Sequence, residues 1–164
     1  PPEQVVKMLN ELFTVLTEVV FRHGGVVDKF IGDCLMAVWG APIADENHAA
    51  KAVAAAEDMM RFLEIGAEGW RQRYGLEVRV AIGINSGAAV VGNIGSDKRM
   101  DYTVVGDVVN VAARLESIAA PNQVLVAEET KRSANGFRFR LLGERNLTGR
   151  ARSVNVYELC LDYD

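Results

Sequence analysis

Cysteine is scarce in this sequence: its 164 residues include two, Cys34 and Cys160. Two cysteines are too few for a disulfide framework, and each stands in an apolar run, so we expect buried free thiols in a reducing compartment. No apolar run approaches the roughly 20 residues that span a bilayer, and the start of the chain does not resemble a signal peptide. These absences favour a soluble, cytoplasmic domain, which a tether or sensor module outside this segment could still hold at a membrane.

An excess of positive charge is also lacking, because 18 Lys and Arg stand against 22 Asp and Glu, a formal net charge of −4. This balance disfavours nucleic acid as the main partner, although it allows a local cationic pocket for phosphates. Hydrophobic residues make up 49% of the sequence, so a chain of this length should bury one substantial core. We expect a single domain over residues 1–164.

Several common catalytic motifs are absent as well. The sequence has no Walker-type phosphate loop, no dinucleotide-binding fingerprint, no cluster of zinc ligands and no Ser/Cys–His–acid arrangement. His23 and His48 stand alone near the ends of predicted helices, where we expect a capping or surface role. The closely spaced glycines between 83 and 95 resemble a phosphate loop at first sight, but they are more typical of turns and close strand packing.

Hydrophobic periodicity predicts helices alternating with strands. The order, α-ββ-α-ββ-α-β-α-ββ, indicates an α+β sheet with helices mainly on one face, not a doubly wound nucleotide-binding fold. In chain order we expect a helix over 1–23, a hairpin over 26–40, a helix over 46–74, strands over 76–84 and 89–95, a strand–turn–helix unit over 100–118, a strand over 123–126, a helix over 127–133, and strands over 137–143 and 154–159.

The strand–turn–helix unit reads MDYTVVGDVVNVAARLESI. Its helix has an apolar stripe at helical spacing, and Asn110 and Arg114, four residues apart, project side by side from a different face. An amide and a guanidinium presented together suit a site for a polar, anionic ligand. In the alternative interpretation, Asp107 is a helix N-cap, and Asn110 and Arg114 belong to a solvated face.

The predicted hairpin reads VVDKFIGDCLMAVWG. Two β-rich runs flank Gly32–Asp33, which predicts a tight two-residue turn. Taken alone, Asp33 is a turn residue, and Lys29 is a strand lysine whose charged end reaches water. Asp28 is expected to be a surface residue at a strand edge.

Four segments of the chain occur in a specific order: DKFIGDCLMAVWG, VRVAIGINSGAAVVGNIG, DYTVVGDVVNVAARLE and a basic loop before the last strand. Together they closely resemble the catalytic domain of class III nucleotidyl cyclases, in the bacterial, homodimeric adenylyl cyclase form, and the resemblance covers essentially the whole chain. It implies a ferredoxin-like βαββαβ-type sheet with extra C-terminal strands. It also implies conversion of ATP to 3′,5′-cyclic AMP and pyrophosphate, by in-line attack of the ribose 3′-hydroxyl on the α-phosphorus.

The resemblance assigns roles to residues of this chain. Asp33 matches one of two aspartates that hold two divalent cations, Mg²⁺ or Mn²⁺. Asn110 matches the asparagine that orients the ribose, and Arg114 matches the arginine that stabilises the transition state. Lys29 and Thr103 match the pair that reads adenine, whereas a guanine-selecting relative would carry an acid and a cysteine or similar residue there. Three basic residues are candidate ligands of the triphosphate: Lys98, Arg99 and Arg150.

In this family each active site is shared between two subunits, one offering the aspartates and the other offering the base, ribose and transition-state contacts. Because this chain carries both sets, we expect a homodimer with two composite sites. The other metal aspartate belongs to a strand before the opening helix, so we expect that strand and that ligand upstream of Pro1. Two alternatives stay open: a catalytically inactive regulatory domain that binds ATP, and a guanylyl cyclase.

Overall fold

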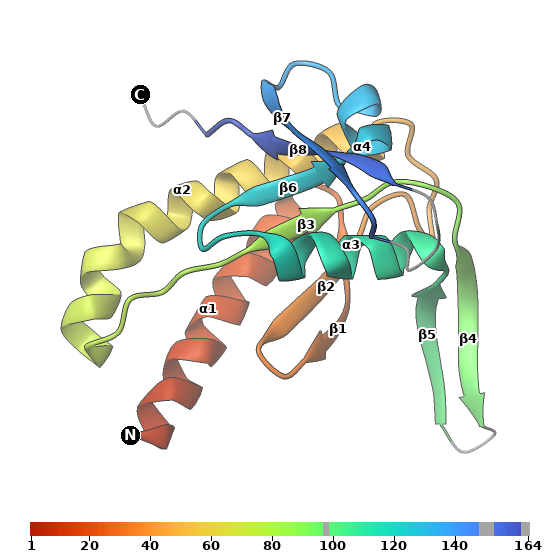
Figure 1. Cartoon of the computed structure of the whole chain (residues 1–164). Coiled ribbons are helices and arrows are strands. Elements are labelled where there is room, and N and C mark those ends of the chain that lie inside the picture. The colour runs from red at the N-terminus through yellow and green to blue at the C-terminus, as the bar shows by residue number, and fades with distance from the viewer. Residues whose placement is uncertain (97–98, 148–152, 162–164) are drawn as a thin grey trace.

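The structure is a computed structural model of the whole chain and describes residues 1–96, 99–147 and 153–161, with only the backbone described at 93–96 and 99–103. Figure 1 shows helices packed around a central sheet. In chain order the elements are α1 (Pro2–Arg22), β1 (Val26–Ile31), β2 (Cys34–Val38), α2 (His48–Tyr74), β3 (Ile82–Ile84), β4 (Val90–Ser96), β5 (Arg99–Val105), α3 (Asp107–Ile118), β6 (Val124–Ala127), α4 (Glu128–Ser133), β7 (Phe139–Arg145) and β8 (Val154–Leu159).

In the described residues the central sheet has four strands, in the order β3-β6-β8-β7. β3 runs parallel to β6, whereas β8 is antiparallel to both of its neighbours. All four residues of β6 are buried. Because alternate residues of a strand point to opposite faces, Val124 and Val126 join the core on the α1–α2 side, and Leu125 and Ala127 join a second core with α3. The sheet is therefore covered on both faces at its centre.

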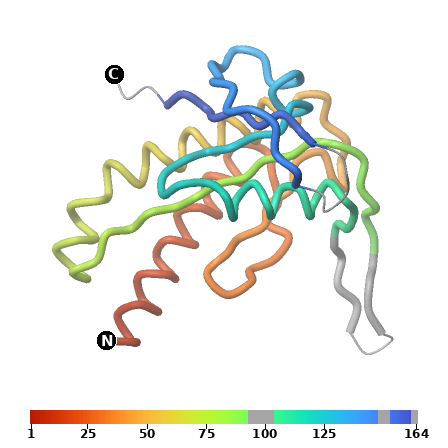
Figure 2. Tube along the Cα trace, in the orientation of Figure 1, coloured from red at the N-terminus to blue at the C-terminus, as the bar shows by residue number. Residues whose placement is uncertain are grey.

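α1 and α2 lie side by side and antiparallel on one face of the sheet (Figure 2). α1 begins at Pro2, whose fixed φ suits the first turn of a helix. Its buried face shares one core with alanines of α2, and α4 packs against the same helix. Three of the four helices in the described residues therefore cover this face, as expected. None of the helices in the described residues is both long and apolar enough to cross a bilayer. The buried residues of α1 are Leu12, Leu16, Val19 and Val20.

Two hairpins, β1–β2 and β4–β5, form two-stranded antiparallel sheets of their own in the described part of the chain. The α+β class, with extra C-terminal strands β7 and β8, is the one expected. The strand expected over 76–84 is shorter, however, because β3 comprises Ile82–Ile84. Upstream of β3, the Val80 amide donates a hydrogen bond to the Asn122 side chain, and the Val80 carbonyl accepts one from the Asn122 amide. These bonds to a turn replace the ladder that a longer strand would need.

The expectation of two buried thiols was wrong for Cys34, which is exposed, whereas Cys160 is partly buried. β2 begins at Cys34, directly after the exposed hairpin turn, and the strand becomes partly buried only from Leu35 onward. An apolar neighbourhood in the sequence therefore did not predict burial at the first residue of the strand.

Candidate active site

α3 lies directly on β3, the first strand in the order β3-β6-β8-β7 of the central sheet. Gly83 makes this approach possible, because a Cβ at this position would overlap backbone atoms of α3 and lie 2.8 Å from the Leu115 Cβ. Just after β3, Asn85 Nδ2 donates a hydrogen bond to the Val108 carbonyl oxygen at 3.2 Å. Val111 and Leu115 are buried on the inner face of the helix. Close backbone packing and one polar contact thus fix the position of α3 on the sheet.

A different face of α3 presents the two residues that the helical spacing places side by side. Asn110 and Arg114 are both exposed. Among the described residues, neither side chain takes part in a hydrogen bond or an ion pair. The amide and the guanidinium are therefore available to a ligand.

α3 begins at a turn that requires glycine. Gly106, the N-cap, has φ of +150°, and a Cβ there would lie 3.5 Å from the Ala89 Cα. No side chain in the described residues caps the helix, and Asp107 occupies its first turn, where a carboxylate interacts favourably with the helix dipole. The alternative interpretation of Asp107 as the N-cap was therefore wrong by one residue.

The β1–β2 hairpin presents Asp33 at its turn, as expected. Gly32 has φ of +59°, a conformation that favours glycine, and Asp33 follows it with its side chain exposed. The Cys34 thiol donates a weak hydrogen bond to Asp33, with Sγ and Oδ1 3.7 Å apart. Partial desolvation raises the pKa of this thiol, and the carboxylates of Glu116 and Asp33 raise it further. Within the described residues no cation pairs with Asp33, so its negative charge is available to a cation.

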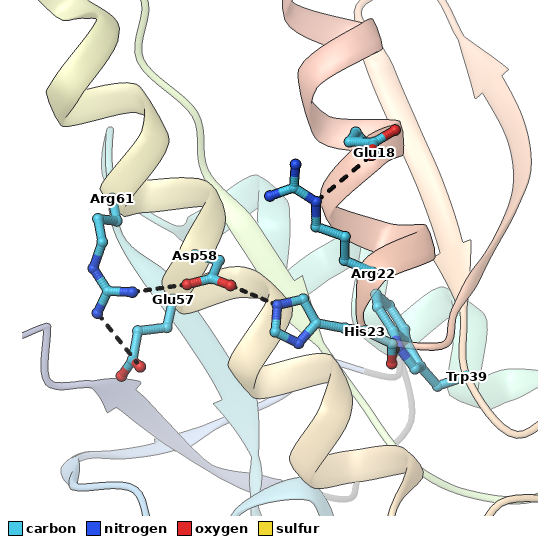
Figure 3. Close-up of polar contacts among 7 residues, drawn as sticks. All are labelled: Glu18, Arg22, His23, Trp39, Glu57, Asp58 and Arg61. Atoms are coloured by element: carbon cyan, nitrogen blue, oxygen red, sulfur yellow. Dashed lines mark hydrogen bonds and ion pairs between the residues drawn. The ribbon is translucent and has the colours of Figure 1, made fainter.

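The other end of this hairpin contacts the end of α1, which in turn contacts α2. Trp39, which follows β2, donates a hydrogen bond from Nε1 to the backbone oxygen of His23 at 3.0 Å, and its ring covers Gly25. The His23 ring reaches α2, where Nε2 lies 2.6 Å from Asp58 Oδ2. Asp58 also accepts a hydrogen bond from Arg61, so its carboxylate lies between the two side chains (Figure 3). These contacts fix the base of the hairpin.

Lys29 lies on β1, with its side chain 40% exposed. Its Nζ lies 3.4 Å from Oδ2 of Asp28, and the Asp28 side chain is only 5% exposed. The expectation that Asp28 is a surface residue was therefore wrong. The register explains the difference: Val27 pairs with Ala37 but Lys29 pairs with Met36, which leaves Asp28 as an extra residue in the strand.

β5 joins the elements that carry the candidate residues, because it contacts both β1, which carries Lys29, and α3. Thr103 and Arg99 lie on β5, and only their backbone is described. The other candidate phosphate ligands, Lys98 and Arg150, lie outside the described residues. The structure thus brings β1 and β5 together, the two strands that carry Lys29 and Thr103, the residues predicted to read adenine.

A divalent cation would find one open carboxylate here. In the part of the chain that the structure describes, no group of three or more His, Cys, Asp and Glu side chains forms a ready-made cation site. Asp33 fits a hard cation nevertheless, because it is exposed, has no cationic partner there, and supplies the oxygen donors that Mg²⁺ and Mn²⁺ prefer. Its remaining ligands would come from water, phosphates or another carboxylate.

Comparisons with known sequences identify the family of the chain. Residues 1–160 match the family described as Adenylate and Guanylate cyclase catalytic domain. Adenylate cyclase 1 of Rhizobium meliloti (strain 1021) is 38% identical over 161 residues, which cover 96% of this chain and 24% of that protein. The chain thus spans about a quarter of the length of this relative.

Solved structures give the same result. The crystal structure of the adenylyl cyclase CyaB from P. aeruginosa matches with a TM-score of 0.91 at 31% identity, covering 98% of this chain and 84% of that chain. The guanylyl cyclase Cya2 matches with a TM-score of 0.88 at 36% identity, covering 98% of this chain and 82% of that chain. The fold, the motifs and the sequence similarity agree, and the chain belongs to the family of adenylate and guanylate cyclase catalytic domains, the class III nucleotidyl cyclases.

Proposed function

We propose that this protein is an adenylyl cyclase, which converts ATP to 3′,5′-cyclic AMP and pyrophosphate in the cytoplasm. The observation that carries the proposal is the exposed pair Asn110 and Arg114 on α3, which has no partner among the described residues and lies on a helix that contacts β5. Membership of the cyclase family supplies the class of reaction, and these side chains supply groups suited to it.

The proposed roles of the α3 residues follow from their chemistry. In an in-line phosphoryl transfer, positioning and charge stabilisation supply most of the rate. The Asn110 amide would hold the ribose so that its 3′-hydroxyl faces the α-phosphorus. The Arg114 guanidinium, which stays charged at any ordinary pH, would meet the negative charge that develops on the phosphate oxygens. Its removal should cost about a hundredfold or more in turnover.

Lys29 and Thr103 would read the base. An ammonium has donors and no acceptor, so Lys29 suits N1 of adenine, which accepts a hydrogen bond, and not N1 of guanine, which carries a hydrogen. The Thr103 hydroxyl would accept a hydrogen bond from the exocyclic amine. Three basic residues would bind the triphosphate tail: Lys98, Arg99 and Arg150.

Asp33 would hold divalent cations at the hairpin turn, together with a second carboxylate from outside the described residues. When bound, two such cations, Mg²⁺ or Mn²⁺, would neutralise phosphate charge and make the 3′-hydroxyl easier to deprotonate. The part that this chain plays is to present the Asp33 carboxylate on a turn whose base is fixed by Trp39 and His23.

A homodimer would complete the site. One protomer would offer Asp33, and its partner would offer Lys29, Thr103, Asn110 and Arg114, so that each dimer has two composite sites. Lys29 and Asp33 lie four residues apart on one hairpin, and in this arrangement they serve different sites.

A guanylyl cyclase is the second candidate, because Cya2 is described as a guanylyl cyclase and is similar to almost the whole chain. The pair Lys29 and Thr103 favours ATP, since it lacks the acid expected of a residue that reads guanine. The ratio of activity with ATP to activity with GTP distinguishes the two candidates.

The test is to incubate the full-length protein with ATP or GTP and Mn²⁺ and to measure cyclic AMP and cyclic GMP. We expect cyclic AMP as the main product and its loss in Arg114→Ala, with the variant still folded by circular dichroism. Binding of ATP without product would contradict the proposal and favour a regulatory domain. Preference for GTP would make the protein a guanylyl cyclase.

A further inference from the structure

The strand that carries Lys29 contains a β-bulge, and the bulge determines what Lys29 contacts. In a regular strand, adjacent residues such as Asp28 and Lys29 point to opposite faces. Here Asp28 is an extra residue between two register pairs, and an extra residue of this kind redirects nearby side chains. The result is that the Asp28 carboxylate and the Lys29 ammonium meet, with Oδ2 and Nζ 3.4 Å apart.

The two side chains differ in exposure, 5% for Asp28 and 40% for Lys29. A carboxylate withdrawn from water is unfavourable unless a positive charge or hydrogen bonds compensate it. The Lys29 ammonium, at the end of a flexible four-carbon chain, supplies such a charge while part of it stays accessible.

We infer that Asp28 is a positioning residue for base recognition: its buried carboxylate holds the Lys29 ammonium in place, so that the ammonium is already oriented when a purine nucleotide binds. This inference rests on the proposed role of Lys29 in reading adenine. An ammonium fixed before binding loses less rotamer freedom on binding, which increases affinity for the base that it fits. Asp28 therefore contributes to the preference for adenine over guanine without touching the nucleotide.

The pair also lies on the appropriate strand. β1 contacts β5, and β5 carries Thr103, the other residue proposed to read the base. An arrangement that fixes Lys29 relative to β1 therefore fixes it relative to β5 as well. The Lys51–Asp45 ion pair, with Nζ and Oδ2 2.5 Å apart, lies at the start of α2 and involves none of the proposed site residues. It provides a matched control.

The test is a double-mutant cycle on the full-length protein with Asp28→Asn, Lys29→Met and the double variant, measuring ATP affinity by titration and the ATP-to-GTP activity ratio. We expect Asp28→Asn to weaken ATP binding and raise KM by about threefold to tenfold, with kcat at saturating ATP little changed. The ATP-to-GTP ratio should fall. In the Lys29→Met background, Asp28→Asn should have no further effect, because Asp28 acts through Lys29.

Additive losses in the double variant, or no effect of Asp28→Asn on ATP binding, would overturn the inference. The control Asp45→Asn removes an Asp–Lys pair elsewhere and should leave ATP affinity unchanged. If Asp28→Asn does not fold, as judged by its Tm, Asp28→Glu replaces it. The added methylene should displace the ammonium and produce the same non-additive loss. If Lys29→Met itself leaves ATP binding and base preference unchanged, the proposed role of Lys29 fails, a result distinct from failure at Asp28 alone.

Discussion

Gly83 of β3 and Leu115 of α3 are in such close contact that a methyl group on Gly83 would lie 2.8 Å from the Leu115 Cβ and would overlap the helix backbone. The helix that carries Asn110 and Arg114 therefore takes its position from the absence of a side chain on the neighbouring strand.

Gly83→Ala should lower both stability and activity. The methyl group has no free space, so α3 must shift away from β3, at a cost of about 1–3 kcal/mol. The shift also displaces Asn110 and Arg114, and a displacement of this kind can reduce turnover strongly. Thermal unfolding and the rate of cyclic AMP formation measure the two effects.

Gly92→Ala is the matched control for stability. Gly92 also lies in a strand, β4, and among the described atoms a Cβ there would meet nothing within 4 Å. Its Tm should therefore stay close to that of the wild type. Equal losses of stability in the two variants would show that the replacement of a strand glycine, and not the approach of α3, is responsible.

Mixing two inactive variants tests the composite site. Asp33→Ala and Arg114→Ala should each abolish cyclic AMP formation. In an equal mixture, half of the dimers are mixed and each mixed dimer has one intact site, so about a quarter of the wild-type activity should return. No recovery, after exchange of subunits has been confirmed by labelling, would contradict a site shared between protomers.

Trp39→Phe should loosen the hairpin that carries Lys29 and Asp33. The substitution keeps an aromatic ring over Gly25 but removes the Nε1 donor to the His23 carbonyl, which should cost about 1 kcal/mol. We expect a fall in Tm of about 2–4 °C together with reduced cyclic AMP formation.

Trp70→Phe is the corresponding control, because it removes an indole hydrogen bond that joins two helices and does not involve the hairpin. Trp70 Nε1 donates to Glu11 at 3.2 Å, between α2 and α1. A similar loss of Tm with activity retained would assign the effect of Trp39→Phe to the hairpin. Equal losses of activity in both variants would assign it to general destabilisation.

Glu11 should make the fold sensitive to acid. The Tyr74 hydroxyl donates to its carboxylate at 2.7 Å, and this hydrogen bond is the main reason why the pKa of Glu11 lies below its usual value of 4.5, with smaller contributions from Arg73 and Trp70 and an opposing one from desolvation. A carboxylate whose pKa is lowered by folding stabilises the protein above pH 4.5, and that stabilisation is lost as the pH falls below it. Because Glu11 is 31% exposed, solvent screening keeps the effect small.

Comparison with Glu11→Gln over a pH series measures this contribution. At pH 7 the variant should unfold about 2–4 °C below the wild type, and the difference should narrow as the pH falls below 4.5. A difference that is constant down to pH 3 would show that the charge of Glu11 does not contribute.

Local patterns in the sequence predicted the parts of the site that depend on local structure. The Gly32–Asp33 turn follows from a Gly-Asp pair between two β-rich runs, and Gly32 has the positive φ that such a turn uses. The exposed position of Asn110 and Arg114 follows from helical periodicity. The catalytic and binding roles of Lys29, Thr103, Asn110 and Arg114 remain predictions, since the structure tests placement and not chemistry.

Features that depend on pairing between distant segments were not predicted. Val80 looks like a strand residue, but Asn122, far along the chain, takes its backbone hydrogen bonds. Asp28 looks like a surface residue, because the bulge that buries it is a property of the register between β1 and β2. In the sequence, the only sign of the Asp28–Lys29 ion pair is that the two residues are adjacent in a β-rich run. The regular alternation of side chains along a strand predicts instead that they point to opposite faces.

β6 links the two cores of the molecule within four consecutive buried residues, Val124 and Val126 on one side and Leu125 and Ala127 on the other. Neither layer of helices can separate from the sheet without exposing residues of this strand. Melting of α3 and melting of the α1–α2 layer are therefore thermodynamically coupled, and the domain should unfold in one cooperative transition. A mutation that weakens the α1–α2 layer should consequently also destabilise α3, which carries Asn110 and Arg114 on the opposite side of the sheet.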